Sequence, residues 1–241
     1  MVIDVSSFEI SAPGFRPALT IHRVIFDVQS FVIDDYFRHK VPITNAVRHA
    51  AHKRQAEFLG GRIAAREALA ARGLPGCIPG TGEKREPLWP PGWTGSITHS
   101  HNVAMAVVLP SSPDLPNGVG LDIEPVLDLK LLLEIRHSVM DGAEADLLLS
   151  STTMSFNEGG TLLLSAKESL FKALFYQVGD WFDFDAARLT SFDDEVFTLQ
   201  LTRSLAPHLL AGRQFRGTYR AFDNQLLTLI AWGAVHSHPL A

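Results

Sequence analysis

The order of helical and strand-like patterns along the chain constrains its fold most. Residues 47–72, rich in Ala, Leu, Glu and Arg, predict a helix, and residues 96–110 predict a strand pair or one bent strand. A second helix is predicted at residues 165–177. Strand-like segments follow it at residues 195–202, 214–222 and 226–235. A long helix followed by antiparallel strands, present twice, predicts an α+β fold of two similar halves.

Composition excludes several other kinds of protein. The chain has 241 residues, 46% of them hydrophobic and 20% charged, as in globular rather than disordered proteins. Its formal net charge of −5 provides no overall positive field for nucleic acid. The first ten residues lack the basic start of a signal peptide, and no apolar run approaches the ~18 residues of a membrane span. Because the single Cys77 cannot form an internal disulfide, we expect a cytoplasmic protein.

Two carboxylates end the segment V-G-L-D-I-E-P, which we interpret as a short strand closed by Pro125. Residues two apart in a strand share a face, so Asp122 and Glu124 are expected to project together. This orientation suits a hard cation such as Mg²⁺, which takes a few carboxylates together with water and phosphate oxygens. The alternative is a solvated strand end, and two acids alone favour that alternative.

The second predicted helix supplies a third carboxylate, in S-A-K-E-S-L-F-K-A-L-F. Glu168 and Lys172 are four residues apart and share a helix face, where the acid could bind metal or accept a proton and the lysine could contact phosphate. An equally good interpretation is structural. Ser165 and Glu168 match a capping box, and Glu168 could form a surface ion pair with Lys172. We expect Lys167, farther round the helix, to meet another phosphate or solvent.

Two further segments carry residues that could hold phosphate. In G-S-I-T-H-S-H-N, His99 and His101 lack the Cys/His set of a zinc site, so phosphate oxygens or water are the expected partners. The first predicted helix carries basic residues that form either an edge for an anionic ligand or a solvated face: Lys53, Arg54, Arg62 and Arg66.

The order of these segments resembles that of one enzyme family, the Sfp-type 4′-phosphopantetheinyl transferases. The two hallmark motifs of that family, G-x-D-x-E and S-x-K-E-x-x-x-K, are present here as G-L-D-I-E and S-A-K-E-S-L-F-K. Two other segments resemble the branch of enterobactin synthetase component D and PcpS-like enzymes, namely K-R-Q-A-E-F-L-G-G-R-I-A-A-R and P-L-W-P. The resemblance spans residues 53–175.

The resemblance implies a fold of two similar α/β halves with pseudo-twofold symmetry and an active site between them. We place the first half at residues 1–124, with the coenzyme A-binding helix, the Gly/Pro-rich loop of residues 73–93 and the acid pair. The second half, residues 125–241, carries the catalytic helix 165–177 and antiparallel strands. The presence of two internal halves leads us to expect a monomer.

The resemblance also implies a reaction. Such enzymes transfer the 4′-phosphopantetheine arm of coenzyme A to a serine of an apo acyl, peptidyl or aryl carrier protein. The reaction depends on Mg²⁺ and releases adenosine 3′,5′-bisphosphate. It serves fatty acid, nonribosomal peptide and siderophore biosynthesis.

By motif match, Asp122, Glu124 and Glu168 would bind Mg²⁺, and Asp122, Glu168 and Lys172 would be the catalytic residues. Glu168, directly or through a metal-bound water, would be the base for the incoming serine. Lys172 would bind the pyrophosphate and stabilise the leaving phosphate. With two acids in the first half and one in the second, the metal would connect the halves.

The family match assigns the remaining residues to coenzyme A. His99, with Thr98 beside it, would contact its phosphates, and this chain reads I-T-H-S where many relatives read I-S-H-S, which keeps a hydroxyl. Arg54, Arg62 and Arg85 are assigned to the 3′-phosphate and a nearby phosphate. Arg85 lies in the Gly-rich loop, where relatives outside this branch often have Lys-Pro.

Two other classes of protein fit part of the sequence. A metal-dependent phosphohydrolase or nucleotidyltransferase would use the same acids, but it does not explain the complete order of motifs. In a non-catalytic nucleotide-binding module the acids would be purely structural. Transfer of mass from coenzyme A to an apo carrier protein distinguishes the transferase from both.

Overall fold

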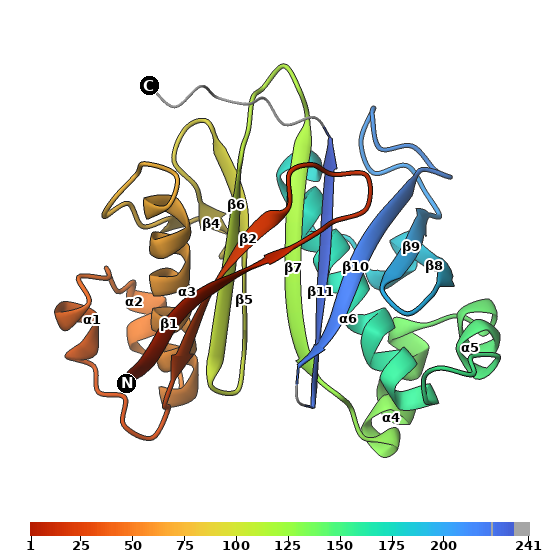
Figure 1. The fold of residues 1–241 in the computed structure, drawn as a ribbon, viewed down its shortest axis with the longest axis horizontal. Coiled ribbons are helices and arrows are strands. Elements are labelled where there is room, and N and C mark those ends of the chain that lie inside the picture. Colours follow the sequence, from red (N-terminus) through yellow and green to blue (C-terminus); the bar gives the residue numbers. More distant parts are fainter. Residues whose placement is uncertain (223, 234–241) are drawn as a thin grey trace. The chain divides into compact units, whose positions relative to one another are not determined.

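The computed structural model describes residues 1–222 and 224–233, which form two compact units. The fold is of the predicted α+β class, with helices packed on antiparallel sheets (Figure 1). The first unit contains residues 1–10 and 18–115, and the second contains residues 11–17 and the described residues from 116 to 233. The boundary predicted after Glu124 falls inside strand β7 (Asn117–Pro125). The chain divides before β7 instead, because β7 pairs with β11 (Gln225–Gly233) of the second unit.

The sheet of the first unit has the strand order β1-β2-β6-β5. Its strands are β1 (Val2–Ile10), β2 (Leu19–Phe26), β5 (Trp93–Ser100) and β6 (Val103–Pro110). The antiparallel β5–β6 hairpin shows that residues 96–110 are a strand pair rather than one bent strand. The sequence did not predict β1 and β2. A two-stranded ribbon, β3 (Gly80–Thr81) with β4 (Pro87–Leu88), forms in the Gly/Pro-rich segment.

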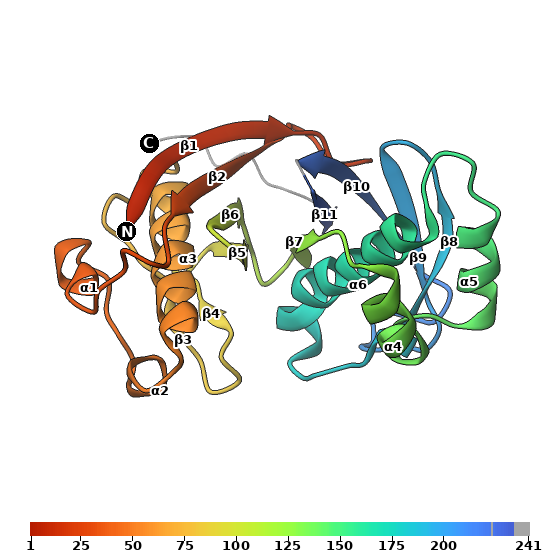
Figure 2. The same cartoon turned by 90° about the horizontal axis from the view of Figure 1, so that it is seen from below.

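Helix α3 (His52–Ala70) packs on β2, β5 and β6 of this sheet (Figure 2). The helix predicted at residues 47–72 is in fact divided, since Asn45–Arg48 form a separate short helix, α2, after α1 (Asp35–Arg38). The two glycines inside α3 do not break it. A Cβ added at Gly60 would lie 2.9 Å from the Phe26 ring, and one at Gly61 would lie 2.9 Å from Ile97 Cγ2. The glycines therefore allow the helix to pack closely on the sheet.

The sheet of the second unit has the strand order β7-β11-β10-β9-β8. Besides β7 and β11 its strands are β8 (Ala187–Phe192), β9 (Val196–Leu201) and β10 (Gln214–Phe222), and a single 3₁₀ turn, Phe184–Ala186, precedes β8. The three strands predicted after residue 194 correspond to β9, β10 and β11. The last two residues of the third predicted strand, 234 and 235, lie outside the described residues. The sequence did not predict β8.

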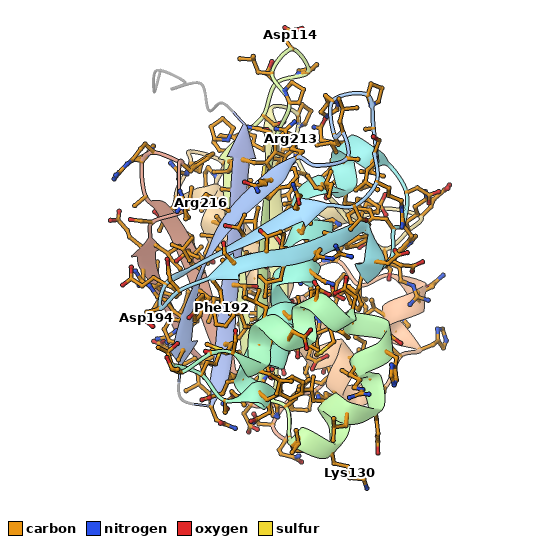
Figure 3. The ribbon with its side chains drawn as sticks, turned by 90° about the vertical axis from the view of Figure 1, so that its right-hand side faces the viewer. Asp114, Lys130, Phe192, Asp194, Arg213 and Arg216 are labelled. Carbon is orange, nitrogen blue, oxygen red and sulfur yellow. The ribbon has the colours of Figure 1, made fainter. Side chains whose placement is uncertain are left out.

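Three helices accompany this sheet: α4 (Leu129–Val139), α5 (Gly142–Leu149) and α6 (Phe156–Val178). Helix α6 packs along β7 and β11, and α4 and α5 contact α6 (Figures 1 and 2). On the exposed side of the unit, Lys130 projects from α4, and Asp194 lies at the β8–β9 turn (Figure 3).

Helix α6 is longer than the predicted 165–177 because its start signal lies upstream. Ser155 and Glu158 form a capping box at its N-terminus, and Gly179, with φ of 73°, ends it in the left-handed conformation. Ser165 is therefore well inside the helix, and its interpretation as a capping residue is wrong. Among the helices of the described residues, none is long and apolar enough to cross a membrane.

Candidate active site

The acid pair lies on β7, whose register places Asp122 opposite Thr228 of β11 and Glu124 opposite Leu226. Asp122 is only 3% exposed, and Glu124 is partly buried. The interpretation of Asp122 as a solvated strand-end acid is therefore wrong. A buried carboxylate needs compensating partners, so its surroundings are informative.

Two glycines of β7 bring the backbone of α6 against this strand. A Cβ at Gly120 would overlap the carbonyl oxygen of Ser169, and one at Gly118 would overlap that of Ala173. The first of these glycines is the glycine of the G-x-D-x-E motif. Its lack of a side chain allows the helix to lie directly on the strand that carries Asp122, which places the two hallmark motifs side by side.

Both carboxylate oxygens of Asp122 accept hydrogen bonds from α6. Lys172 Nζ lies 2.6 Å from Oδ1 and also donates to the Leu121 carbonyl at 3.2 Å. Ser165 Oγ donates to Oδ2 at 2.8 Å. The amino group of Lys172 is thus paired with Asp122 rather than placed in a surface ion pair with Glu168.

Burial raises the pKa of both glutamates. Burial, followed by the charge of Asp122 and then that of Glu168, raises the pKa of Glu124 to about 7, although Lys172 opposes the shift. Burial also raises the pKa of Glu168, with Asp122 adding to the effect and Lys172 again opposing it. The site therefore favours an added cation or a proton.

The donor chemistry of the site fits Mg²⁺, since Asp122, Glu124 and Glu168 offer the hard oxygen ligands that this ion takes. The arrangement is not a preformed metal cage. Within the described residues, no three His, Cys, Asp or Glu side chains are gathered so that they could hold a metal ion. Both oxygens of Asp122 are hydrogen-bonded to Ser165 and Lys172. All three acids belong to the second unit, so a metal held by them would not connect the two units.

In the first unit, the structure brings His99 of β5 together with residues of α3. Arg54 Nη1 is hydrogen-bonded to His99 Nε2, and Glu57 Oε2 lies 3.6 Å from His99 Nδ1. Glu57 is 8% exposed and also pairs with Lys53 at 3.7 Å. Thr98 is 3% exposed and, as the neighbour of His99 in a strand, presents its side chain on the opposite face. Arg54 and His99 are thus in direct contact, with Arg54 donating to the ring nitrogen.

Arg62 and Arg85 both belong to the surroundings of the Gly/Pro-rich loop. Arg62, 6% exposed, donates to Gly80 O and to Thr81 Oγ1, both at 2.9 Å, and its guanidinium lies 4.5 Å from the centre of the Phe58 ring. Arg85 is exposed, with φ of 68°, between the two strands of the ribbon. Arg62 therefore braces the loop that carries Arg85.

The expectation for Lys167 was wrong. Its side chain is 4% exposed, and its amino group lies 2.9 Å from Glu144 Oε1 and 2.8 Å from the Val139 carbonyl. Burial lowers its pKa, and the Glu144 carboxylate opposes this shift. Lys167 thus faces a buried carboxylate and not solvent or a phosphate.

Sequence reasoning missed Glu57, Glu144 and Thr228. Glu57 lies four residues after Lys53 in the K-R-x-x-E-F segment, and this helical spacing was the available signal. Glu144 and Thr228 lie in ordinary helix and strand patterns, and no sequence signal distinguishes them.

Two family models match this chain. Residues 43–109 match the 4′-phosphopantetheinyl transferase N-terminal domain, and residues 118–228 match the 4′-phosphopantetheinyl transferase superfamily. The chain therefore belongs to the 4′-phosphopantetheinyl transferase superfamily, and it is an enzyme of that class. The family inferred from the motifs is confirmed.

Individual proteins of this superfamily are similar to the chain over most of its length. The chain is 35% identical over 226 residues to enterobactin synthase component D of Salmonella typhi, covering 94% of this chain and 90% of that protein. It is 36% identical over 171 residues to enterobactin synthase component D of Escherichia coli K12, covering 67% and 78%. The identity to 4′-phosphopantetheinyl transferase Npt of Nocardia iowensis is 30% over 199 residues, covering 77% and 86%.

Proposed function

We propose that this protein transfers the 4′-phosphopantetheine arm of coenzyme A to a serine of an apo carrier protein and releases adenosine 3′,5′-bisphosphate. The observation that carries the proposal is the contact between the two hallmark motifs, in which Lys172 and Ser165 of α6 hold Asp122 of β7. Family membership supplies the reaction class. We place the enzyme in the cytoplasm as a monomer, acting on carriers of fatty acid, nonribosomal peptide or siderophore biosynthesis.

In the proposed reaction the serine oxygen bonds to the phosphorus that carries the pantetheine arm. The bond from that phosphorus to the bridging oxygen of the pyrophosphate breaks, and the electron pair leaves with adenosine 3′,5′-bisphosphate. The serine proton passes to Glu168, whose raised pKa makes it a stronger base than an exposed glutamate. The amino group of Lys172 offsets the charge that develops on the leaving phosphate.

Oxygens of Asp122, Glu124 and Glu168 would hold Mg²⁺ in this proposal. Support comes from their oxygen chemistry and from the pKa of Glu124, which burial, with the charges of Asp122 and Glu168 adding to it, raises to about 7. When bound, Mg²⁺ would neutralise pyrophosphate charge and orient it. Because the amino group of Lys172 is paired with the Asp122 carboxylate, it lies beside one of the oxygens proposed to hold the metal ion.

The basic residues of the first unit are proposed to hold the coenzyme A phosphates. Arg54 of α3 is a cationic donor that lies beside His99 of β5 and donates to its Nε2, and Arg85 is exposed on the loop that Arg62 braces. Charge-assisted hydrogen bonds of this kind are the usual means of binding phosphate. The buried Thr98 contributes to β5 rather than to the face of His99.

The test incubates the protein with coenzyme A, Mg²⁺ and a panel of apo carrier proteins, and measures the intact mass of each carrier. Transfer adds one phosphopantetheine arm to a carrier, and the addition should disappear when the acceptor serine is replaced by alanine. A phosphohydrolase would consume coenzyme A without labelling a carrier, and a binding module would do neither. Either of these outcomes would contradict the proposal.

A further inference from the structure

Three hydroxyl groups lie buried behind the carboxylate of Asp122. Ser165 and Ser169 come from α6 and Thr228 from β11, and each of the three residues is 0% exposed. None of the three can touch a ligand in solution. A buried polar group is retained at a cost unless its hydrogen bonds are satisfied, so the partners of these hydroxyls define what they do.

The hydroxyls form a continuous chain of hydrogen bonds that ends at Asp122. Ser169 Oγ lies 2.7 Å from Thr228 Oγ1, and Thr228 Oγ1 lies 2.9 Å from both Ser165 Oγ and the Ser165 carbonyl oxygen. Ser165 Oγ lies 2.8 Å from Asp122 Oδ2. The chain connects α6, β11 and β7 within the second unit.

The chemistry of the groups gives this chain a direction. An ionised carboxylate can only accept, so the Ser165 proton is directed to Asp122. Thr228 Oγ1 donates to the Ser165 carbonyl oxygen, and its single proton is shared between that oxygen and Ser165 Oγ, both at 2.9 Å. Ser169 Oγ donates to the Thr228 carbonyl oxygen at 3.1 Å and lies 2.7 Å from Thr228 Oγ1, so it holds Thr228 in turn. To the extent that Ser165 Oγ accepts from Thr228, its own hydroxyl is polarised, which strengthens its bond to the carboxylate.

Serine inside a helix ordinarily returns its hydroxyl to the carbonyl four residues back. Ser165 instead points away from its own helix toward β7, and the position of Thr228 beside it favours this orientation. Thr228 stands directly opposite Asp122 in the β7–β11 register. Thr228 is thus the residue paired with Asp122 in the sheet, and it also contacts Ser165, the hydroxyl donor to Asp122.

We propose that Thr228 and Ser165 are positioning residues for the transfer reaction. They hold Asp122 Oδ2 in place, so that Oδ1 remains directed toward Lys172 and would be available to a metal ion. This inference rests on the proposed function. In the described part of the chain, the side chains of Glu124 and Glu168 receive no such hydrogen bond, so Asp122 is the oriented member of the three acids.

The test replaces Thr228 by valine, which keeps the shape and removes the hydroxyl. Electron paramagnetic resonance measures the binding of Mn²⁺ to the purified protein. We expect the Mn²⁺ affinity of the variant to fall by about threefold to tenfold, which corresponds to the loss of one internal hydrogen bond. The apparent Mg²⁺ requirement for transfer should rise similarly and kcat should fall. The KM for coenzyme A should change little, because the hydroxyl is fully buried. Thr228→Ser, which keeps the hydroxyl, should restore Mn²⁺ binding.

Thr218→Val is the matched control. Thr218 lies in the same sheet, on β10, is 6% exposed, and donates to the Glu195 carbonyl at 2.8 Å. Its loss should change stability by a comparable amount without changing Mn²⁺ binding. If both valine variants weaken Mn²⁺ binding equally, the positioning role is overturned.

A double-mutant cycle with Ser165→Ala tests whether Thr228 acts through Ser165. We expect Thr228→Val to have almost no further effect on Mn²⁺ binding once Ser165 is alanine, whereas additive losses would overturn the inference. Ser165→Ala also serves if Thr228→Val does not fold, since it removes the donor itself. If the folded wild type binds Mn²⁺ with the expected coupling but labels no carrier, the proposed function fails and the hydrogen-bond chain stands. Absence of Mn²⁺ binding by the folded wild type would overturn both.

Discussion

Asp122 differs from the two glutamates near it because both of its oxygens are held by side chains of α6. Lys172 supplies charge to one oxygen and Ser165 supplies a hydroxyl to the other. Glu124 and Glu168 instead carry raised pKa values, for which burial is the largest cause. The three acids therefore have different physical roles, and their variants should behave differently.

Asp122→Asn and Glu168→Gln should both reduce transfer, but for different reasons. The first removes charge from a metal-binding oxygen, so excess Mg²⁺ should partly restore a loss of about 10-fold to 100-fold. The second removes the proposed base, a loss of roughly 10²-fold to 10⁴-fold that excess Mg²⁺ should not restore. Steady-state transfer kinetics across a Mg²⁺ series measures both effects. Wild-type turnover in either folded variant would return that acid to a structural role.

Glu124→Gln should stabilise the metal-free protein, and the gain should depend on pH. The pKa of Glu124 is raised from 4.5 to about 7, so between these values the folded state binds a proton that the unfolded state lacks. Folding is therefore weakened as pH rises through 7, and the penalty is absent below 4.5. Thermal unfolding of wild type and Glu124→Gln, in chelator, should show the Tm difference above pH 7 and its disappearance below pH 4.5. A difference that grew as pH fell would contradict this sign.

Arg62→Ala tests whether this arginine binds the 3′-phosphate or only braces the loop. If it binds the phosphate, coenzyme A affinity should fall by about tenfold or more, and the affinity of 3′-dephospho-coenzyme A should fall much less. Titration calorimetry with both ligands makes the comparison, and Arg54→Ala provides a second basic residue for it. Equal losses of affinity for both ligands would show that Arg62 does not bind the 3′-phosphate and only braces the loop through Gly80 and Thr81.

At the scale of elements, the site depends on the close approach of α6 to β7. That approach is possible because Gly118 and Gly120 present no side chains to the helix backbone. A second contact holds α6 at its other side, where the buried Lys167 pairs with Glu144 of α5. The position of Glu168, next to Lys167 in the chain, is set by these two contacts.

Gly120→Ala should damage the fold and the site together. The added methyl would overlap the Ser169 carbonyl and lie 2.7 Å from the Ala173 backbone nitrogen, so α6 must move away from β7. Such overpacking typically costs about 1–3 kcal/mol, and a backbone partner cannot give way as a side chain does. Chemical denaturation should show the loss, and Gly142→Ala, where nothing lies within 4 Å of the added Cβ, is the control. A fully stable, active Gly120→Ala protein would contradict the role given to this glycine.

At the scale of the whole molecule, each unit has its own hydrophobic core and its own sheet. The chemistry predicted from the sequence is divided between them. The carboxylates, Lys172 and Ser165 belong to the second unit, and Arg54 and His99 belong to the first.

The sequence by itself determined the family, the α+β class, the strand that carries Asp122 and Glu124, and the helix that carries Glu168 and Lys172. These follow from local periodicity, turn residues and motif order, all of which are encoded over a few neighbouring residues. Strands β1, β2 and β8 were not predicted, although Pro13 and Gly14 after β1 and Asp193 and Asp194 after β8 are typical turn residues.

Only the tertiary structure decided which of these residues touch. Ser165 matched a capping box, yet it bonds to Asp122, 43 residues away in the chain, and to Thr228, 63 residues away. Lys167 was expected to meet phosphate or solvent and instead faces a buried Glu144. Local pattern specifies the face on which a side chain lies. The packing of α6 on β7 and β11 decides which residue that side chain contacts. The segments in contact are far apart in the chain, so no local sequence pattern indicates that they meet.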